Sequence, residues 1–351
     1  HLAHTNMQMM NMVAALEMAL NNGRHPLTDW QLGPQTGIVE NGDFRTFDEF
    51  FDAFTRQFAF IIDRSIEYNH MLGEAHQYLR PTPFLSSLIE GCVDKGADVT
   101  GGGARYNSSG TAIVGLADVT DSLMVIKKLV YDERKVTFAA LKEAVDTNFE
   151  NDPALLALVR KKTPLFGSGS EEAVAMANRV AKWAHDYYDA IPHYRGGKYT
   201  TGFWSMSQHV AFGTLSGALP SGRLRGKPFT PGLTPQPFAS PSLLDNIRDV
   251  ARLDPVSLNN NIAFNVKVVP SASDSQEKTV HDMFSYVKTY FDLGGMQMQM
   301  NAVTSAMLKD AMVHPENYRN LIVRISGYNA YFVTLNRDMQ LELIERAEYS
   351  I

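Results

Sequence analysis

The stretch VRISGYNAYF, Val323–Phe332, lies near the C-terminal end of the 351-residue chain and governs how the remainder is interpreted. Apolar residues on both sides of Gly327 are typical of two short strands, here at 321–325 and 331–334. Glycine adopts positive φ angles without the steric cost of a Cβ atom, and hairpin turns often need such an angle. The residues alone therefore predict a hairpin with Gly327 at its turn.

Helix and strand patterns alternate along the rest of the chain. Apolar spacing predicts helices at 2–20, 47–79, 119–130, 137–149, 171–190, 277–293, 304–313 and 338–348, and strands at 262–268 and 296–300. Residues 194–241 are rich in Gly, Pro, Ser and Thr without sustained periodicity, yet their aromatic residues favour an ordered functional segment. No repeat or hydrophilic linker divides the chain, so we expect one connected α/β unit.

The composition excludes several classes of function. There are 32 Lys and Arg residues against 38 Asp and Glu residues, a formal net charge of −6, and no basic stripe that would follow a phosphate backbone. No apolar run approaches the ~20 residues that a membrane-spanning helix needs. We therefore expect neither nucleic acid nor a membrane as a partner.

A single cysteine, Cys92, cannot form an internal disulfide or a chain-encoded iron–sulfur cluster, which indicates a reducing cytoplasm. The ten histidines show no metal-ligand spacing, so we predict no metal site. Cys92 has no histidine near it in sequence, and lone cysteines are more often buried small hydrophobes than nucleophiles. We expect a structural role for it.

The pattern R-I-S-G-Y-x-x-x-F close to a chain end resembles the radical-bearing signature of the glycyl radical enzymes, the pyruvate formate-lyase-like superfamily. Only glycine suits that chemistry, because loss of its α-hydrogen gives a planar radical stabilised by the flanking amide nitrogen and carbonyl, which a Cβ atom would crowd. Further collinear segments are similar to landmarks of the same family, namely Gly101–Asn107, Asp121–Lys128, Leu219–Pro235 and Tyr290–Asn301.

The resemblance implies a fold and a set of site residues. The fold would be the C-terminal part of a ten-stranded α/β barrel, with helices outside and the glycyl loop inside. Residues 1–290 would be an incomplete barrel domain and 291–351 the glycyl radical domain. Gly327 would carry the radical, while Arg324, Ser326 and Tyr328 would support its loop.

The resemblance also implies a thiyl-forming cysteine outside this sequence. In the family that cysteine precedes a helix ending in a pattern like L-E-x-A-L-N-N-G, which stands here at Leu16–Gly23. We therefore expect the cysteine upstream of His1, and we expect a fragment that is inactive alone. Cys92 lies in a segment similar to a different part of the family.

Several reactions stay open on the resemblance. The body motifs favour a lyase that cleaves a C–X bond, releasing water, amine or sulfite. Arg195 would clamp an anionic head group or serve a structural role. Gln208, followed by the apolar Val210 and Phe212, would fit a fumarate-adding alkyl- or arylalkylsuccinate synthase, although no arginine precedes Arg24. A formate acetyltransferase-like enzyme and a non-enzymatic spare-part glycyl radical subunit also stay open.

Partners follow from the same resemblance. A separate S-adenosylmethionine iron–sulfur activase would install the radical, since this chain lacks the cysteines for such a cluster. No cofactor would stay bound, and the substrate would be a small molecule. We expect a cytoplasmic homodimer that functions anaerobically, because oxygen would cut the backbone at Gly327.

Overall fold

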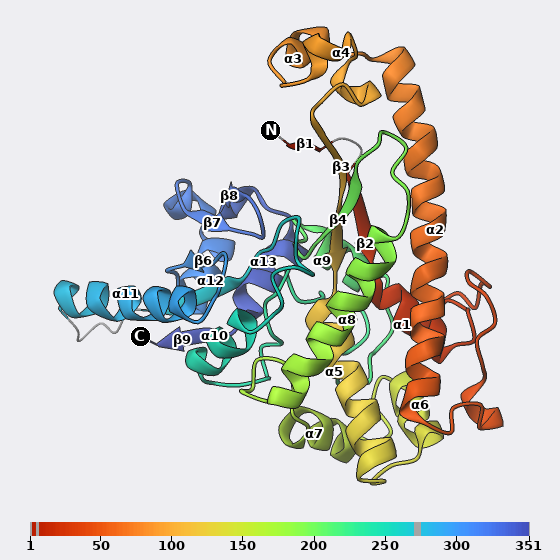
Figure 1. The fold of residues 1–351 in the computed structure, drawn as a ribbon. Helices are drawn as coiled ribbons and strands as arrows, with labels where there is room; N and C mark the ends of the chain where they lie inside the picture. Colours follow the sequence, from red (N-terminus) through yellow and green to blue (C-terminus); the bar gives the residue numbers. More distant parts are fainter. Residues whose placement is uncertain (1, 5–6, 270–274, 351) are drawn as a thin grey trace.

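The computed structural model describes residues 2–4, 7–269 and 275–350 (Figure 1). The strands are β1 (Leu2–His4), β2 (Gln8–Asn11), β3 (Tyr106–Val114), β4 (Lys198–Gly202), β5 (Asn265–Val269), β6 (Gln299–Asn301), β7 (Ile322–Arg324), β8 (Asn329–Tyr331) and β9 (Glu348–Ser350). The α-helices are α1 (Met12–Leu20), α2 (Phe47–Leu79), α3 (Pro83–Ser87), α4 (Cys92–Lys95), α5 (Leu116–Val125), α6 (Phe138–Asp146), α7 (Pro153–Lys162), α8 (Glu171–Asp189), α9 (Gln208–Thr214), α10 (Leu243–Ala251), α11 (Gln276–Asp292), α12 (Ser305–Val313) and α13 (Arg337–Glu345), and a π-helix follows α5 at Ile126–Asp132.

A parallel sheet is built around β3. Strands β1 and β2 pair with successive parts of one edge of β3, and β4 pairs with the other edge. Eight of the nine β3 residues are buried, as expected for a parallel strand covered on both faces. Directly after β4, Phe203 forms a parallel bridge with Ile262, which lies shortly before β5. Strand β5 is the central strand of a second parallel sheet, with the order β6-β5-β9.

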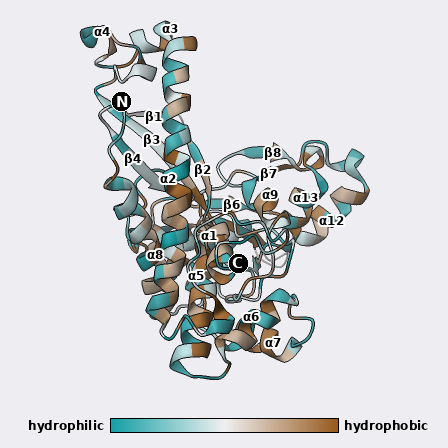
Figure 2. Cartoon of the chain, turned by 90° about the vertical axis from the view of Figure 1, so that its right-hand side faces the viewer, coloured by the Kyte–Doolittle hydropathy of each residue, from teal (hydrophilic) through white to brown (hydrophobic). Residues whose placement is uncertain are grey.

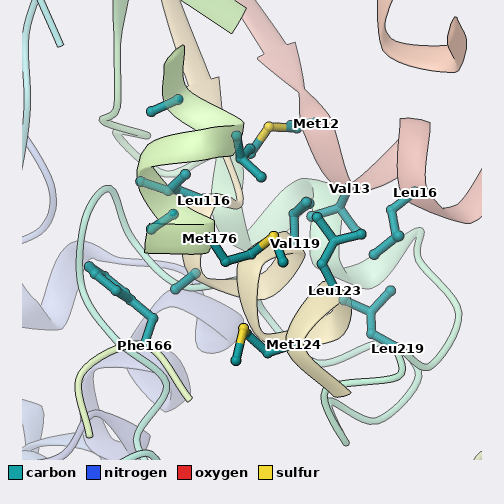
Figure 3. Close-up of a cluster of buried hydrophobic side chains, with 14 of the residues drawn as sticks. Met12, Val13, Leu16, Leu116, Val119, Leu123, Met124, Phe166, Met176 and Leu219 are labelled. Carbon is teal, nitrogen blue, oxygen red and sulfur yellow. The ribbon is translucent and has the colours of Figure 1, made fainter. Parts of the chain in front are cut away.

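Helices α1 and α5 supply the centre of the main hydrophobic core. Figure 3 shows Val13 and Leu16 from α1 lying close to Val119 and Leu123 from α5, with Met12 of α1 on the side of Leu116. All six side chains are fully buried, and burying each one stabilises the fold by about 1.5–3 kcal/mol. Figure 2 shows hydrophobic residues gathered where these two helices lie.

The 33-residue helix α2 confirms the predicted helix at 47–79. Thr46 and Glu49 form a reciprocal capping box at its start, which satisfies two backbone N–H groups. Its first half buries a phenylalanine stripe, including Phe50, Phe54 and Phe58. Its second half runs beside the sheet, where Ser65 donates to Gln8 of β2 over 2.7 Å, and it carries α3 and α4 at its tip (Figure 1).

Two predicted helices are partly wrong. In place of one helix at 2–20, strand β2 pairs with β3 up to Asn11, and the Asn11 side chain then caps α1. The predicted helix at 338–348 ends at Glu345, since Glu348–Ser350 adds to the edge of β5. In both places pairing with a strand far away in the sequence overrides the local helical spacing. The region 194–241, predicted as irregular, contains β4 and α9.

A second, separate hydrophobic core lies in the C-terminal region. It consists of Val210, Val303, Leu308, Ala311, Val323, Ile325, Phe332, Met339, Leu343 and Ile344. The predicted turn at Gly327 is confirmed, because β7 and β8 pair antiparallel on either side of it. The strand predicted at 331–334 is misplaced, since β8 ends at Tyr331 and Phe332–Thr334 forms a 3-10 helix. All but Val210 of this second core come from α12, the hairpin region, α13 and the segment before α12. Among the described residues no helix has the length and apolarity to cross a lipid bilayer.

Candidate active site

Gly327 occupies the turn of the β7–β8 hairpin with a φ angle of +100°. A Cβ atom built on it would have one neighbour, Trp204 Cε3 at 3.7 Å, so space alone would admit a larger residue. The positive φ angle is what favours glycine, since L side chains rarely adopt it. Within these 351 residues the Gly327 backbone is exposed.

The peptide group between Ser326 and Gly327 is held at both of its polar ends. The backbone N–H of Met206 donates to the Ser326 carbonyl over 3.0 Å, and the Gly327 N–H donates to Gln299 Oε1 over 3.1 Å. Gln299 is itself fixed, because the same oxygen accepts from Arg324 Nε over 2.7 Å. The amide plane next to the Gly327 α-carbon is therefore fixed by contacts from β6 and from the segment before α9.

The carbonyl groups preceding that peptide are fixed as well. Asn301 forms a two-way pair with the Arg324 backbone, accepting from its N–H over 2.7 Å and donating to its carbonyl over 2.8 Å. Arg346 Nη2 donates to the Ile325 carbonyl over 2.9 Å. Three consecutive carbonyls, at residues 324, 325 and 326, thus accept hydrogen bonds from outside the hairpin.

Arg346 is held in turn by Glu342, one turn earlier on α13. The two side chains form a bidentate ion pair with Nε–Oε1 and Nη2–Oε2 distances of 2.7 and 2.9 Å, and both residues are buried. Burial acts to raise the pKa of Glu342, but the charge of Arg346, together with the contact to His209, outweighs it and lowers that pKa to about 2. The ion pair therefore stays charged at every ordinary pH.

His209 on α9 connects this ion pair to the segment that follows β4. Its Nε2 lies 3.4 Å from Glu342 Oε2, and its Nδ1 lies 2.9 Å from Ser205 Oγ. His209 and Ser205 are both fully buried. Polar contacts thus run from Ser205 through His209, Glu342 and Arg346 to the backbone before Gly327.

Two family models match this chain in sequence. Residues 2–213 match the model described as "Pyruvate formate lyase-like", and residues 229–333, which include Gly327, match the one described as "Glycine radical". The chain belongs to the pyruvate formate lyase-like family. The family membership predicted from the R-I-S-G-Y signature is thereby confirmed.

Individual proteins that are similar to this chain agree with the family assignment. It is 34% identical over 342 residues to trans-4-hydroxy-L-proline dehydratase of Clostridioides difficile, covering 97% of this chain and 43% of the relative. It is 30% identical to isethionate sulfite-lyase of Desulfovibrio desulfuricans, covering 97% of this chain and 41% of the relative. The chain spans less than half the length of both.

The solved structure of the glycerol-bound B12-independent glycerol dehydratase from Clostridium butyricum superimposes with a TM-score of 0.92 at 32% identity. The match covers all of this chain and 44% of the dehydratase. The fold predicted for this family member, part of the α/β barrel of glycyl radical enzymes, is confirmed by this likeness.

Two of the predicted loop-support residues pack as part of the hairpin. Ser326 is fully buried, and the partly buried Tyr328 accepts from the Ile325 N–H through its carbonyl over 2.9 Å. The predicted substrate residues on α9 differ from one another in their packing. Val210 belongs to the second core, whereas Phe212 packs against the main core and Gln208 is partly buried at the helix start.

The structure does not bring Arg195 to Gly327. Arg195 is buried before the first residue of β4, where its Nη2 donates to the Ser108 carbonyl over 2.8 Å. Met206, which contacts the hairpin, lies beyond the opposite end of β4, and that strand alone spans about 16 Å. These contacts support a structural role for Arg195.

Sequence reasoning missed the residues that fix the hairpin. Gln299 and Asn301 stood inside a segment singled out only as a landmark, although their alternation with methionines places both on one face of β6. Glu342 and Arg346 carry the i, i+4 signal of a helical ion pair. His209 has no signal that would link it to the hairpin, since Glu342 lies far from it in the sequence.

Cys92 lies in α4, at the tip of α2 and away from the hairpin (Figure 1). Its side chain is 3% exposed, and burial together with the charge of Asp98 raises the pKa of its thiol. Both features agree with a structural cysteine. Within the described ranges no group of His, Cys, Asp and Glu residues could hold a metal ion.

Proposed function

We propose that Gly327 carries a backbone radical and that the protein is a glycyl-radical-dependent lyase that cleaves a C–X bond. The observation that carries this proposal is the Ser326–Gly327 peptide, held at both polar ends in a turn that favours glycine. An α-carbon radical is stabilised when the flanking nitrogen and carbonyl lie in its plane. Arg324 contributes by holding Gln299, and Ser326 and Tyr328 by shaping the turn.

The reaction would be a balanced hydrogen relay. The Gly327 radical takes a hydrogen atom from a cysteine thiol, and the resulting thiyl radical takes one from a substrate carbon. The substrate radical then expels X⁻ together with a proton. The product radical recovers a hydrogen atom from the thiol, and the thiyl radical restores the radical on Gly327.

The thiol would come from outside these 351 residues. Cys92 is buried in α4, and the pKa of its thiol is raised. Figure 1 shows α4 at the far end of α2, away from the β7–β8 hairpin. A buried thiol apart from the radical carrier cannot exchange hydrogen with it. We therefore propose that this chain holds the radical but does not turn over alone, and that residues 1–290 and 291–351 act as barrel and glycyl radical domains.

The names of the relatives support elimination as the reaction class. They include a hydroxyproline dehydratase and a sulfite-lyase, which favours release of water or sulfite over addition to fumarate. We propose a small polar substrate near Gln208, and we do not place Arg195 among its contacts. A separate S-adenosylmethionine iron–sulfur activase would install the radical on a homodimer.

Electron paramagnetic resonance tests the proposal. After anaerobic activation, the radical electron should couple to the remaining α-hydrogen and give a doublet. Gly327→Ala should abolish the doublet, whereas Gly42→Ala, at an exposed glycine where an added Cβ atom would have no neighbour within 4 Å, should retain it. A doublet that survives in Gly327→Ala contradicts the assignment.

A further inference from the structure

We infer that His209 and Glu342 act through Arg346 as positioning residues that hold the backbone before Gly327 at the place required for hydrogen transfer. This inference rests on the proposed function. The inference concerns hydrogen bonds to the main-chain carbonyls of residues 324–326. The R-I-S-G-Y sequence pattern around Gly327 does not reveal these hydrogen bonds.

The first step is the grip of Arg346 on the hairpin backbone. Its guanidinium donates to the Ile325 carbonyl over 2.9 Å and lies 3.4 Å from the Arg324 carbonyl. The Ile325 carbonyl is two residues from the Gly327 α-carbon. A shift of Arg346 would therefore move the turn itself.

The second step is the orientation of that guanidinium. Two parallel hydrogen bonds to Glu342 fix its plane, and a planar fork of this kind specifies direction as well as distance. Removing the Glu342 charge while keeping its shape would leave Arg346 buried and positively charged. The guanidinium would then reorient toward other acceptors.

The third step links the hairpin to the segment that follows β4. Residues 303–346 supply all of the second hydrophobic core except Val210. The region is joined to α9 by the contact of His209 with Glu342 and to the preceding segment by the Met206–Ser326 hydrogen bond. The Met206–Ser326 hydrogen bond is directional, so it fixes the turn against the segment before α9 more closely than apolar packing does, and the polar contact of His209 with Glu342 holds α13 beside α9.

Solvent exchange of the radical hydrogen reports this position without any substrate. In D₂O the Gly327 radical takes deuterium from an S–D bond of the cysteine. Return of the light hydrogen atom to sulfur then leaves a deuterated radical, so the doublet collapses to a single line. The rate of collapse depends on how well the α-carbon is placed against the sulfur.

The experiment compares Glu342→Gln with Glu345→Gln in the complete enzyme after activation by its activase. Glu345 lies on the same helix but pairs with Lys227 on the surface, at 2.8 Å and about half exposed, so it is a matched control. We expect Glu342→Gln to keep the doublet and to slow its collapse by about ten-fold or more. Glu345→Gln should exchange as the wild type does.

A Glu342→Gln variant that gives the doublet and exchanges at the wild-type rate overturns the inference. If thermal unfolding shows that this variant does not fold, Arg346→Lys is measured, and then His209→Gln, which keeps the ion pair. If the first of these two variants that folds shows the wild-type rate of doublet collapse in D₂O, that result overturns the inference as well. A wild-type doublet that never collapses in D₂O contradicts the hydrogen relay of the proposed function itself and removes the inference with it.

Discussion

The backbone N–H of Gly327 donates a hydrogen bond to the side-chain oxygen of Gln299, 28 residues earlier, over 3.1 Å. The same oxygen accepts from Arg324, so a single acceptor connects the turn to the strand that enters it. Gln299 is buried, and a hydrogen bond to an acceptor that is removed from water is stronger than one in solvent. This contact leads to the first prediction.

Gln299→Met removes the shared acceptor while keeping the length of the side chain. We expect a lower yield of the radical doublet and a faster decay, because the Gly327 amide loses the partner that holds it in the plane of the radical. Gln297→Met is the control, since Gln297 accepts from Phe264 and not from the hairpin. Equal radical yields in the two variants would contradict this role for Gln299.

Glu17 predicts a pH dependence of stability. Burial raises its pKa from 4.5 to about 7, against hydrogen bonds from Ser216 and Gly217. The folded protein therefore retains a proton that the unfolded chain has lost between these two values. The stabilisation is complete below pH 4.5 and disappears as the pH rises through 7.

Glu17→Gln should remove this contribution, because a neutral amide can accept the same hydrogen bonds at every pH. We expect the variant to gain up to about 3 kcal/mol in unfolding free energy over the wild type when the pH rises from 5 to 8. Urea unfolding at both pH values measures the change. Glu40→Gln, at an exposed residue, should show no such gain.

Arg195→Met tests the structural role of that arginine. The substitution removes a buried hydrogen bond to the Ser108 carbonyl, so the free energy of unfolding should fall by about 2 kcal/mol. The radical doublet and its exchange in D₂O should be unchanged, because Arg195 lies at the other end of β4. Loss of exchange in a stably folded variant would place Arg195 in the site.

Air exposure of the activated enzyme should cut the main chain at Gly327. Oxygen adds to an α-carbon radical, and Gly327 is exposed in this chain. Mass spectrometry should find the new end at Gly327 and no cut in Gly327→Ala. A cut that persists in this variant would mean that the radical resides elsewhere.

The sequence predicts the hairpin and long helices well because their signals are local. Gly327 stands between two apolar stretches, and the phenylalanine stripe of α2 repeats at helical spacing under a capping box. The helix predicted across Gln8–Asn11 is wrong because the parallel pairing with β3 joins residues about a hundred positions apart. Local periodicity does not carry that information.

The residues of the candidate site also differ in whether a local sequence signal reveals them. Gly327 could be singled out from its signature, whereas Gln299, His209 and Arg346 reach it from three separate segments. Gln299 and Arg346 bind main-chain atoms of the hairpin, which leave no residue-specific pattern in a sequence, and His209 acts through the side chain of Glu342. The sequence left both roles of Arg195 open, because its Arg-Gly-Gly context carries no information about which end of β4 faces the hairpin.

The most direct test of the radical assignment is electron paramagnetic resonance of activated enzyme grown with [2-¹³C]glycine. If the unpaired electron is on the Gly327 α-carbon, the doublet should show further ¹³C splitting, and both features should vanish in Gly327→Ala. A signal that the label leaves unchanged, as a radical on Tyr328 or Tyr331 would give, contradicts the account.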